Sequence, residues 1–377
     1  MTVAGLIFAN IHDDSISELT RMRTMASVPF GGRYRLIDFT LSNMVNAGIE
    51  NIGIVTSYNY RSLLDHLGTG KDWDLARREA GIKILPPNIT AYDIKNTGPE
   101  STMRLGSMLT ASNFISRCGA DCIVLSDCDT ICNIDLADVI DRHVENGADI
   151  TIVVKNYTDS DRIMSKNSII RSDADGRVTD VRAYTPYEWK GGDISTNMIV
   201  VNRNYLLAQL AIASSRGYTS FFRDILAKHA SKDRFFVYRF DGFYSFVNSI
   251  AGYFESSMEL LDFGIREELF KNPLRPIHTK VRNSAPTLYK EGSRVVNSMI
   301  ADGCVIEGEV ENSIIFRGVR VRRGAKVKNS ILMQDTIVGE NVTLNCVITD
   351  KTAVIRDQCV LSGHRSMPFF IGKGVMV

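Results

Sequence analysis

The sequence has little proline, no excess of either charge and no long hydrophobic run. Nine prolines among 377 residues, with 44% hydrophobic and 23% charged residues, exclude a collagenous or disordered chain. Its 44 basic and 43 acidic residues leave a net charge of +1, which argues against a polybasic protein that coats nucleic acid or membranes. No apolar stretch approaches the ~20 residues that a membrane span needs. No basic segment precedes the first apolar run, so we expect a cytoplasmic protein without nucleic-acid or membrane partners.

The seven cysteines form an odd, scattered set without a Cys-x-x-Cys pair or a neighbouring histidine cluster. An odd number does not match a disulfide framework, and the missing Cys-x-x-Cys pair and histidine cluster argue against a zinc site. We therefore expect reduced and mostly buried thiols, and packing roles for the three cysteines at 122, 128 and 132.

The chain is too long for one compact core, and its first part has the pattern of an α/β domain. Short apolar runs at 3–9, 51–56 and 121–126 are predicted strands, separated by helix-like segments. Asp127 and Asp129 follow the third predicted strand, at the edge of a parallel sheet where ligands bind. A turn in which Asp129 caps a helix is the plainer interpretation.

After residue 270 aliphatic side chains recur every six residues, which is typical of a parallel β-helix. Three such series run through the segment: Ile315, Val321 and Val327; Leu332, Val338 and Leu344; and Ile348, Val354 and Val360. A second repeat starts at Asn297, Asn312, Asn329 and Asn345, at intervals of 15, 17 and 16 residues. An antiparallel sandwich with chance alternation is the alternative.

The predicted organisation is therefore a Rossmann-like α/β domain, with a mixed and mostly parallel sheet, in residues 1–270. A linker and a left-handed β-helix of hexapeptide repeats are predicted in residues 271–377, with the two prolines of 272–277 in the linker. Because a β-helix exposes sheet edges at both ends, we expect this domain to take part in assembly.

Residues 28–39 (Val-Pro-Phe-Gly-Gly-Arg-Tyr-Arg-Leu-Ile-Asp-Phe), with Leu-Ser-Asn at 41–43 and Ala-Gly-Ile at 47–49, closely resemble the sugar-nucleotide pyrophosphorylases. Among these, the sequence is most similar to glucose-1-phosphate adenylyltransferase. The resemblance implies the same two domains and a reaction in which glucose-1-phosphate attacks the α-phosphorus of ATP. Such chemistry needs a glycine-rich phosphate loop, cations and carboxylates that hold magnesium.

The phosphate loop of that family, Gly-Gly-x-Gly-Thr-Arg-Leu, has no counterpart in residues 10–16. The degenerate nucleotide loop comprises Asn10, Ile11, Asp13, Asp14 and Ser15, together with Met25 in place of the family's lysine. Without glycines the backbone cannot approach phosphates closely, and the two aspartates repel a triphosphate. For His12, in the same loop, a polar surface role is expected.

The metal ligands are also incomplete. Asp129 keeps the place of the family's catalytic aspartate, but Phe246 replaces the second magnesium ligand and offers no oxygen. Leu109 replaces another acidic residue, and the family's sugar-phosphate lysine is missing, with Arg182 as a partial substitute. A residual ligand pocket, if present, is expected at Gly106, Asp129, Arg182 and Asn197.

The residues that shape the fold are thus kept, while those that bind phosphates and magnesium are replaced. Losing one charge-stabilising donor alone can lower the rate ~10²–10³-fold, so several replacements together argue against catalysis. We expect a noncatalytic regulatory subunit of bacterial glucose-1-phosphate adenylyltransferase in glycogen synthesis, with no functional catalytic residue, metal or cofactor of its own. The resemblance implies a catalytic subunit that carries the magnesium, a heterotetramer, and self-association of this chain alone. An active enzyme with an unorthodox loop and a stand-alone sensor of sugar phosphates or sugar nucleotides remain the alternatives.

Six basic residues follow one another in the predicted β-helix, and they allow two interpretations. Either they bind an anionic effector or an acidic partner surface, or they are solvated outward faces, which we favour. The six are Arg317, Arg320, Arg322, Arg323, Lys326 and Lys328.

Overall fold

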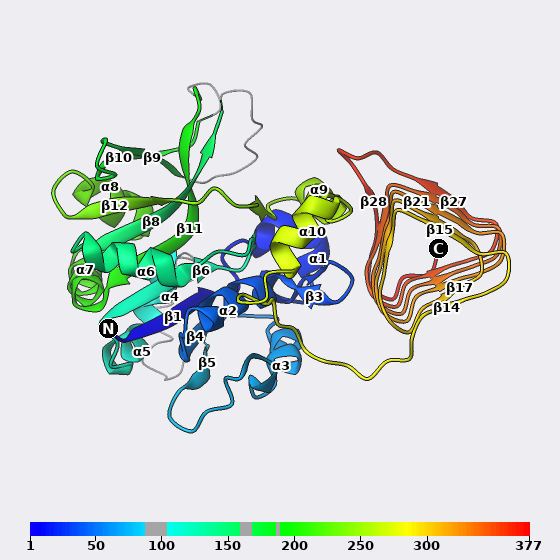
Figure 1. Cartoon of the computed structure of the whole chain (residues 1–377), viewed down its shortest axis with the longest axis horizontal. Helices are drawn as coiled ribbons and strands as arrows, with labels where there is room; N and C mark the ends of the chain where they lie inside the picture. The colour runs from blue at the N-terminus through cyan, green and yellow to red at the C-terminus, as the bar shows by residue number, and fades with distance from the viewer. Residues whose placement is uncertain (87–103, 159–167, 186–188) are drawn as a thin grey trace.

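The computed structural model describes residues 1–86, 104–158, 168–185 and 189–377. Its first half is a mixed sheet covered by helices, and its second half is a three-sided coil of short strands (Figure 1). An extended segment joins the two parts, running from the end of α10 (Phe263–Phe270) to β14 (Leu288–Tyr289).

The three apolar runs predicted as strands form the parallel centre of the first sheet. β1 pairs in parallel with β4 and β6, and β4 pairs in parallel with β5, whereas β11 runs antiparallel to β6, β8 and β9. β12 pairs with β8 in parallel. The strands in spatial order are β10 (Val178–Ala183), β9 (Ser168–Ser172), β11 (Gly192–Asn202), β6 (Cys122–Asp127), β1 (Val3–Phe8), β4 (Asn51–Val55) and β5 (Gly81–Leu85). β8 (Ile150–Tyr157) also pairs with β11, and β12 (Phe235–Arg239) lies on the other side of β8.

Helices bury the apolar side chains on both faces of this sheet. α4, α5 and α7 contribute to the core on one face, and α2, α3 and α6 to the core on the other. This burial explains why the central strands are almost continuously hydrophobic. The helices are α1 (Ser17–Thr20), α2 (Leu36–Asn46), α3 (Arg61–Leu67), α4 (Arg104–Thr110), α5 (Ser112–Arg117), α6 (Leu136–Glu145), α7 (Arg203–Arg216), α8 (Ala227–His229), α9 (Ile250–Glu259) and α10.

Two small antiparallel pairs complete this domain. β2 (Pro29–Phe30) pairs with β3 (Tyr34–Arg35) around the Gly-Gly turn of the family motif. Both of these glycines have positive φ values, 57° at Gly31 and 80° at Gly32, which explains why glycines are needed there. β7 (Thr130–Ile131) pairs with β13 (Ser245–Phe246).

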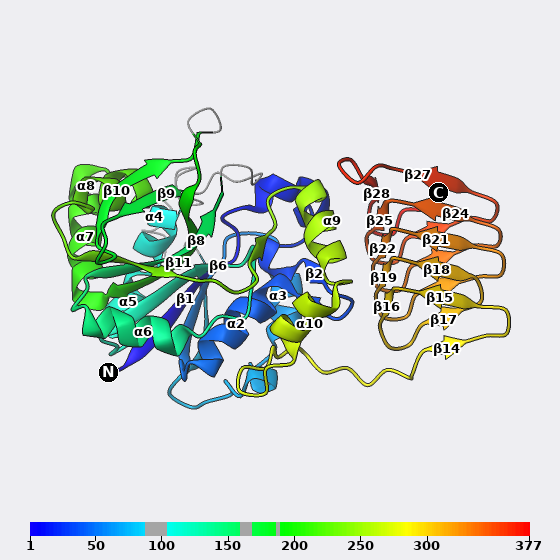
Figure 2. The ribbon, with the colours of Figure 1, turned by 45° about the horizontal axis from the view of Figure 1, so that its top comes forward.

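The C-terminal part is the predicted left-handed β-helix, built from three parallel five-stranded sheets (Figure 2). The first sheet contains β14, β17 (Val305–Ile306), β20 (Arg320–Val321), β23 (Ile337–Val338) and β26 (Val354–Ile355). The second contains β15 (Arg294–Val296), β18 (Glu309–Glu311), β21 (Lys326–Lys328), β24 (Thr343–Asn345) and β27 (Val360–Ser362). The third contains β16 (Met299–Ile300), β19 (Ile314–Ile315), β22 (Ile331–Leu332), β25 (Val347–Thr349) and β28 (Phe369–Ile371).

Two of the three predicted aliphatic series point into the coil, and the third does not. Ile355 lies in the β-helix core, whereas the predicted Val360 is 70% exposed. Ile348 packs instead in the cluster that joins the two domains. The prediction for Ile348, Val354 and Val360 was wrong because a shift of one residue moves a strand's side chains to the other face.

The origin of this shift is visible in the turns that start each repeat. Asn297, Asn312 and Asn329 adopt left-handed backbone conformations, with φ values of 41°, 45° and 45°. In the next coil the left-handed residue is Cys346, with a φ of 52°, and not the predicted Asn345. The serines that follow the asparagines form a ladder, in which Ser313 N–H donates to Ser298 Oγ at 3.1 Å.

The two domains share a continuous hydrophobic core. Outward-facing Ile314 and Ile331 of the third β-helix sheet pack in one cluster with Phe30, Phe39 and Tyr253 of the first domain. α9 and α10 lie beside this sheet in both ribbon views. The shared core shows that the β-helix is held against the first domain over one whole side.

Candidate functional site

The candidate site lies where β1 and β6 end side by side. Phe8 of β1 is in register with Asp127, the last residue of β6. The loop after β1 therefore meets the segment after β6, and it brings His12 to Asp127 and Asp129. His12 Nε2 lies 3.1 Å from Asp127 Oδ2 and 3.7 Å from Asp129 Oδ2. This is the carboxyl edge of the parallel strands, where the sequence predicted a function.

The carboxylates at this edge are buried and contact the basic side chains of His12 and Arg104. Asp127 is 1% exposed and Asp129 5% exposed, and Arg104 of α4 donates to the same Asp127 oxygen that faces His12. Burial alone would lower the pKa of His12, but the charge of Asp129 and the hydrogen bond with Asp127 raise it to about 9. Burial also raises the pKa of Asp129 to about 6. At neutral pH the edge therefore holds a charged imidazole against carboxylates.

The predicted degenerate loop is closed by its own side chains. Asn10 Oδ1 accepts hydrogen bonds from Thr56 Oγ1 at 2.8 Å and from the Ser57 N–H at 2.9 Å, and Asn10 Nδ2 donates to Asp13 Oδ2 at 2.6 Å. The other oxygen of Asp13 accepts the Met25 N–H at 2.6 Å. Burial raises the pKa of Asp13 to about 7 despite these bonds. Asparagine and aspartate oxygens thus occupy backbone donors of the kind that a phosphate loop offers to its ligand.

The remaining loop positions provide no cation for a triphosphate. Asp14 and Ser15 are exposed, and Ile11 packs against the core on one sheet face. Met25 is 2% exposed and belongs to the core between the domains. The side chain at this position is therefore a packing residue that points away from solvent.

The structure places Phe246 beside Asp129. Phe246 pairs with Thr130 in the β7–β13 ladder, and the Val247 N–H donates to the Asp129 carbonyl at 2.8 Å. The ring of Phe246 lies 6.0 Å from the ring of Tyr244. An aromatic pair at the position of the second carboxylate does not fit a magnesium ion, which requires oxygen ligands in octahedral geometry.

The four residues predicted to line a residual pocket do not come together as one site. Asn197, in a left-handed conformation with a φ of 64°, lines a cavity of about 130 Å³ with Arg104. Gly106 lies one helical turn into α4 and is half-buried. Arg182 lies on β10 with its side chain 60% exposed and pairs with Asp180 at 2.5 Å. Arg182 is not among the residues that line this cavity, so its position does not support the sugar-phosphate role suggested for it.

Sequence reasoning underestimated His12, Asp127 and Arg104. The signal for the first two was present, because each follows one of two apolar strands that pair in parallel. Arg104 had no such signal, since it begins a helix and reaches Asp127 only through the tertiary fold. The alternative in which Asp129 caps a helix is wrong: the cap of α6 is Asp135, which accepts from the Ala137 and Asp138 N–H groups.

The thiols of β6 and of the segment that follows it are packing groups. Cys122, Cys128 and Cys132 are all buried, and all described cysteines are free. Burial raises the pKa of Cys122 and of Cys132 to about 12 and that of Cys128 well above its ordinary value. These thiols therefore stay protonated and unreactive.

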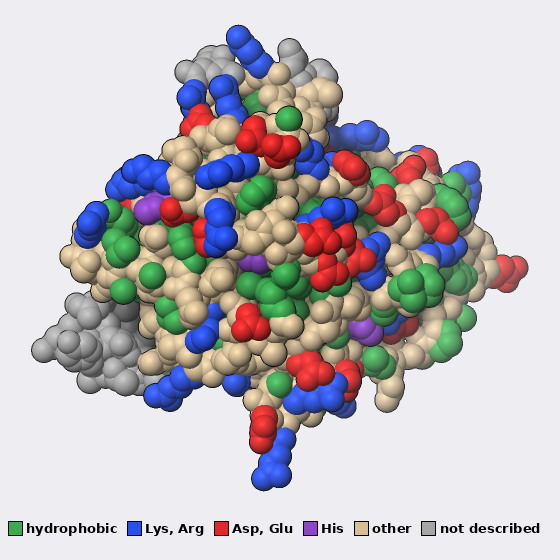
Figure 3. Space-filling model, turned by 60° about the vertical axis from the view of Figure 1, so that its left-hand side comes forward, with side chains coloured by type: hydrophobic (Ala, Val, Ile, Leu, Met, Phe, Trp, Pro, Cys, Tyr) green, Lys and Arg blue, Asp and Glu red, His purple; other side chains and the backbone are tan. Residues whose placement is uncertain are grey.

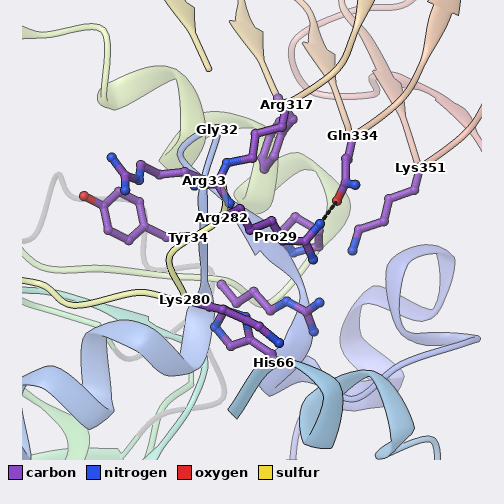
Figure 4. Close-up of a pocket in the computed structure, with 12 residues that line it drawn as sticks. Pro29, Gly32, Arg33, Tyr34, His66, Lys280, Arg282, Arg317, Gln334 and Lys351 are labelled. Atoms are coloured by element: carbon purple, nitrogen blue, oxygen red, sulfur yellow. Dashed lines mark hydrogen bonds between the residues drawn. The ribbon is translucent and has the colours of Figure 1, made fainter. Parts of the chain in front are cut away.

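A second candidate site lies in the seam between the domains (Figure 4). The lining of this pocket in the described chain includes His66, whose pKa is lowered by burial, and six basic residues: Arg33, Arg35, Lys280, Arg282, Arg317 and Lys351. They come from the β2–β3 turn, the interdomain segment and two coils of the β-helix. Figure 4 shows Arg282 and Lys351 extending toward the same space, with Arg282 donating to Gln334 Oε1 at 3.5 Å.

The electrostatics of this basic seam, defined by these six cations, favour an anion. Burial, together with the positive charges of Arg35 and Arg23, lowers the pKa of Lys351 to about 7. Burial likewise lowers the pKa of Arg35 to about 10. Burial is the main cause of both shifts, so an anion bound in the seam would favour the charged forms of these side chains. A phosphate or sulfate group bound here would contact both domains.

The basic run of the β-helix therefore divides in two. Arg320, Arg322, Arg323, Lys326 and Lys328 are exposed, as the solvated interpretation predicts. Arg317 is different, because it is 9% exposed, lines the basic seam and pairs with Asp302 at 2.9 Å.

On the face of the molecule in Figure 3, acidic and basic side chains alternate without one large patch of a single sign. Within the described residues, no helix has the length and apolar character needed to cross a membrane.

Two family models match this chain, and they follow its two structural halves. Residues 15–183 match the model described as "Nucleotidyl transferase", and residues 285–365 match "GlmU-like, C-terminal hexapeptide". These matches agree with the α/β domain and the β-helix of hexapeptide repeats.

Individual relatives align over almost the entire chain. The "Glycogen biosynthesis protein GlgD" of Bacillus subtilis is 34% identical over 372 residues, which cover 99% of this chain and 96% of that protein. The protein of the same name from Geobacillus stearothermophilus is 36% identical over the same shares. The "Glucose-1-phosphate adenylyltransferase" of Bacillus thuringiensis is 28% identical over 96% of this chain and 95% of that enzyme.

Proposed function

Because this chain belongs to the family of glucose-1-phosphate adenylyltransferases and glycogen biosynthesis proteins GlgD, we propose that it is a noncatalytic regulatory subunit of a cytoplasmic bacterial glucose-1-phosphate adenylyltransferase. Its task in glycogen biosynthesis is to assemble with a catalytic homologue, in a heterotetramer, and to change that subunit's activity. The proposal rests on the degenerate site together with the intact scaffold.

The observation that carries the proposal is the loop that follows β1. Asn10 and Asp13 accept hydrogen bonds from backbone N–H groups, and His12 faces Asp127, so polar groups that a phosphate loop would offer to a triphosphate are already engaged. Opening this loop for ATP would break buried hydrogen bonds and separate a buried ion pair, each with a cost of about 1–3 kcal/mol or more. His12 already faces Asp127 and Asp129, and no other side chain of residues 10–16 is basic, so the loop has no further cation to offset that cost.

The magnesium required for adenylyl transfer belongs to the catalytic partner in this proposal. Phe246 supports this assignment, since it lies next to Asp129 at the position of a metal-binding carboxylate. We expect no nucleotide or magnesium cofactor on this chain.

Activation of a partner requires that the assembled state favour its active conformation, and a few kcal/mol of differential interface energy suffice. In the described chain the terminal strands of the β-helix sheets pair on one side only, apart from β26, along which residues 375–377 form hydrogen bonds. The basic seam offers a place for an anionic effector. An anion in the seam would bridge Arg35 of the first domain and Lys351 of the β-helix. Its binding would thus be sensitive to how the domains are held in the assembly.

Assembly with the catalytic homologue from the same organism tests the proposal. The two chains are co-expressed with a tag on this chain only, and mass is measured by size-exclusion chromatography with light scattering. The expected result is a mixed tetramer whose adenylyltransferase activity or effector response differs from that of the catalytic subunit alone. A chain that elutes only as a homo-oligomer, binds a sugar phosphate tightly and leaves the homologue unchanged would instead be a stand-alone sensor.

A further inference from the structure

We propose that His12, Asp127 and Asp129 form a site for one divalent transition-metal ion of the zinc or manganese class. The site shares Asp129 with the magnesium position of adenylyl transfer, but its other two ligands, His12 and Asp127, lie outside the family positions assigned above. It also revises the expectation from sequence that this chain holds no metal. The inference does not depend on the regulatory function.

The three side chains together offer a donor set that suits a transition-metal ion. One atom from each of the three side chains lies within 4.8 Å of the others, with the imidazole nitrogen between the two carboxylates. One imidazole and two carboxylates are ligands typical of Zn²⁺, Mn²⁺ or Fe²⁺, whereas Mg²⁺ takes oxygen ligands almost exclusively. A bound ion would have to lie ~2.0–2.2 Å from each of the three atoms.

The remaining carboxylate oxygens support the site independently of His12. Oδ1 of Asp127 and Oδ1 of Asp129 are buried and have no hydrogen-bond partner within the described chain. A buried carboxylate oxygen without a partner is costly, and native structures rarely leave one so. Two such atoms on adjacent carboxylates at one sheet edge are what a bound cation would satisfy.

The surroundings hold the ligands in place. Arg104 donates to Asp127 Oδ2, so this carboxylate can keep its arginine and present Oδ1 to a metal. The backbone of Asp127 accepts from Thr40 Oγ1 at 3.0 Å, and that of Asp129 accepts from the Val247 N–H. Such supporting hydrogen bonds are typical of metal centres. The two carboxylates and Arg104 together carry one net negative charge, which suits one divalent ion better than two divalent ions.

His12 provides the access route for the ion, and its Nε2 holds either a proton or the metal. Its side chain is 30% exposed, so an ion can enter from solvent while the carboxylates stay buried. The metal replaces the Nε2 proton, which leaves to solvent, and the ion then pins the loop to the sheet edge. In this state metal coordination replaces the ion pair between His12 and Asp127.

The test uses the full chain after treatment with a chelator and dialysis. Isothermal titration with ZnCl₂, MnCl₂ and MgCl₂ measures stoichiometry and affinity, and CoCl₂ provides a visible spectrum. We expect one Zn²⁺ or Mn²⁺ per chain, much weaker Mg²⁺ binding, and a cobalt spectrum without a sulfur charge-transfer band. His12→Gln and Asp129→Asn, each checked for folding by circular dichroism, should weaken binding by tenfold or more.

His229→Gln is the matched control, because His229 also faces a carboxylate, Asp233, at 2.9 Å but lies outside the cluster. The proposal is overturned if Zn²⁺ and Mn²⁺ bind no better than Mg²⁺. It is also overturned if His12→Gln and Asp129→Asn bind as the unchanged chain does, or if the cobalt spectrum shows thiolate ligands.

Discussion

His12 Nε2 lies 3.1 Å from Asp127 Oδ2, although the two residues are 115 positions apart in the sequence. This contact ties the loop after β1 to the end of β6 at the place where related enzymes carry a glycine-rich loop. The contact therefore accounts for two features together: the absence of a phosphate cradle and the burial of charges at the sheet edge. It also defines what must change for this chain to bind ATP.

Restoring the family residues should restore nucleotide binding only when loop and metal position are changed together. We expect magnesium–ATP binding when residues 10–16 are replaced by the family's Gly-Gly-x-Gly-Thr-Arg-Leu with Met25→Lys and Phe246→Asp. Phe246→Asp alone should bind no ATP, because the loop stays closed by Asn10 and Asp13. Isothermal titration with magnesium–ATP measures both. Tight magnesium–ATP binding by the unchanged chain would show that the loop opens without its glycines.

The ion pair between Arg23 and Asp350 should contribute strongly to the attachment of the β-helix. Arg23 Nη2 lies 2.8 Å from both oxygens of Asp350, and the two residues are 2% and 4% exposed. Asp350→Ala leaves a buried arginine without its partner and should lower the free energy of unfolding by about 3–5 kcal/mol. Chemical denaturation measures the loss.

Glu145→Gln is the control for this pair, because its contact with Arg142 at 3.5 Å is exposed on both sides. It should change the free energy of unfolding by less than about 1 kcal/mol. Equal losses from the two substitutions would mean that the Arg23–Asp350 pair does not join the domains.

Sulfate should stabilise the chain through the basic seam, and more strongly below pH 7 than above it. The pKa of Lys351 is lowered to about 7, mainly by burial, so its ammonium group is charged at pH 6 and largely neutral at pH 8. Sulfate keeps its charge over this range, so the difference reports on the protein. Lys351→Met should weaken sulfate binding by about tenfold, the usual effect of losing a charged hydrogen bond.

Thermal unfolding at several sulfate concentrations and both pH values provides the measurement. Lys326→Met, at an exposed lysine of the same domain, is the matched control. The prediction fails if both lysine variants lose the same stabilisation, or if sulfate has no effect on the melting temperature.

His143 should make the fold sensitive to acid. This residue is 2% exposed, and its Nδ1 lies 2.8 Å from Thr151 Oγ1. Burial lowers its pKa from 6.5 to about 4, so between these values the unfolded chain binds a proton that the folded chain does not. The stability due to neutral His143 is thus present above pH 6.5 and is lost as the pH falls toward 4, by up to about 1.4 kcal/mol per pH unit.

His143→Gln should flatten this dependence, because glutamine does not titrate. Urea denaturation between pH 4 and pH 7 compares the variant with the unchanged chain and with His364→Gln, at an exposed histidine of the β-helix. An unchanged slope in His143→Gln would assign the acid sensitivity to other groups.

The elements that the sequence predicted are those set by local periodicity. The strands after Thr2 and Glu50 and the six-residue aliphatic step each depend on a few neighbouring residues, and the structure contains them. The one-residue shift after Asn329 was missed because Cys346, and not an asparagine, adopts the left-handed turn there. Cysteine rarely marks such a turn, so the pattern alone pointed to Asn345.

Contacts between distant segments were harder to predict. The basic seam combines residues from turn, linker and β-helix. Arg33 and Arg35 belong to the motif at 28–39 and Arg317 to the basic run, but no sequence pattern indicated that they come together. The pairing of His12 with Asp127 depends on β1 and β6 lying next to each other. Strand order in a sheet is a property of the whole chain, whereas the missing glycines could be recognised from the sequence directly.

The central claim is that this chain modulates adenylyl transfer without performing it. The most direct measurement is the rate of ADP-glucose formation from ATP, glucose-1-phosphate and magnesium, by this chain alone, by the catalytic homologue alone and by their equimolar mixture. The account predicts no turnover by this chain and a faster or effector-altered rate in the mixture. Robust turnover by this chain alone, abolished in Asp129→Asn, would contradict it.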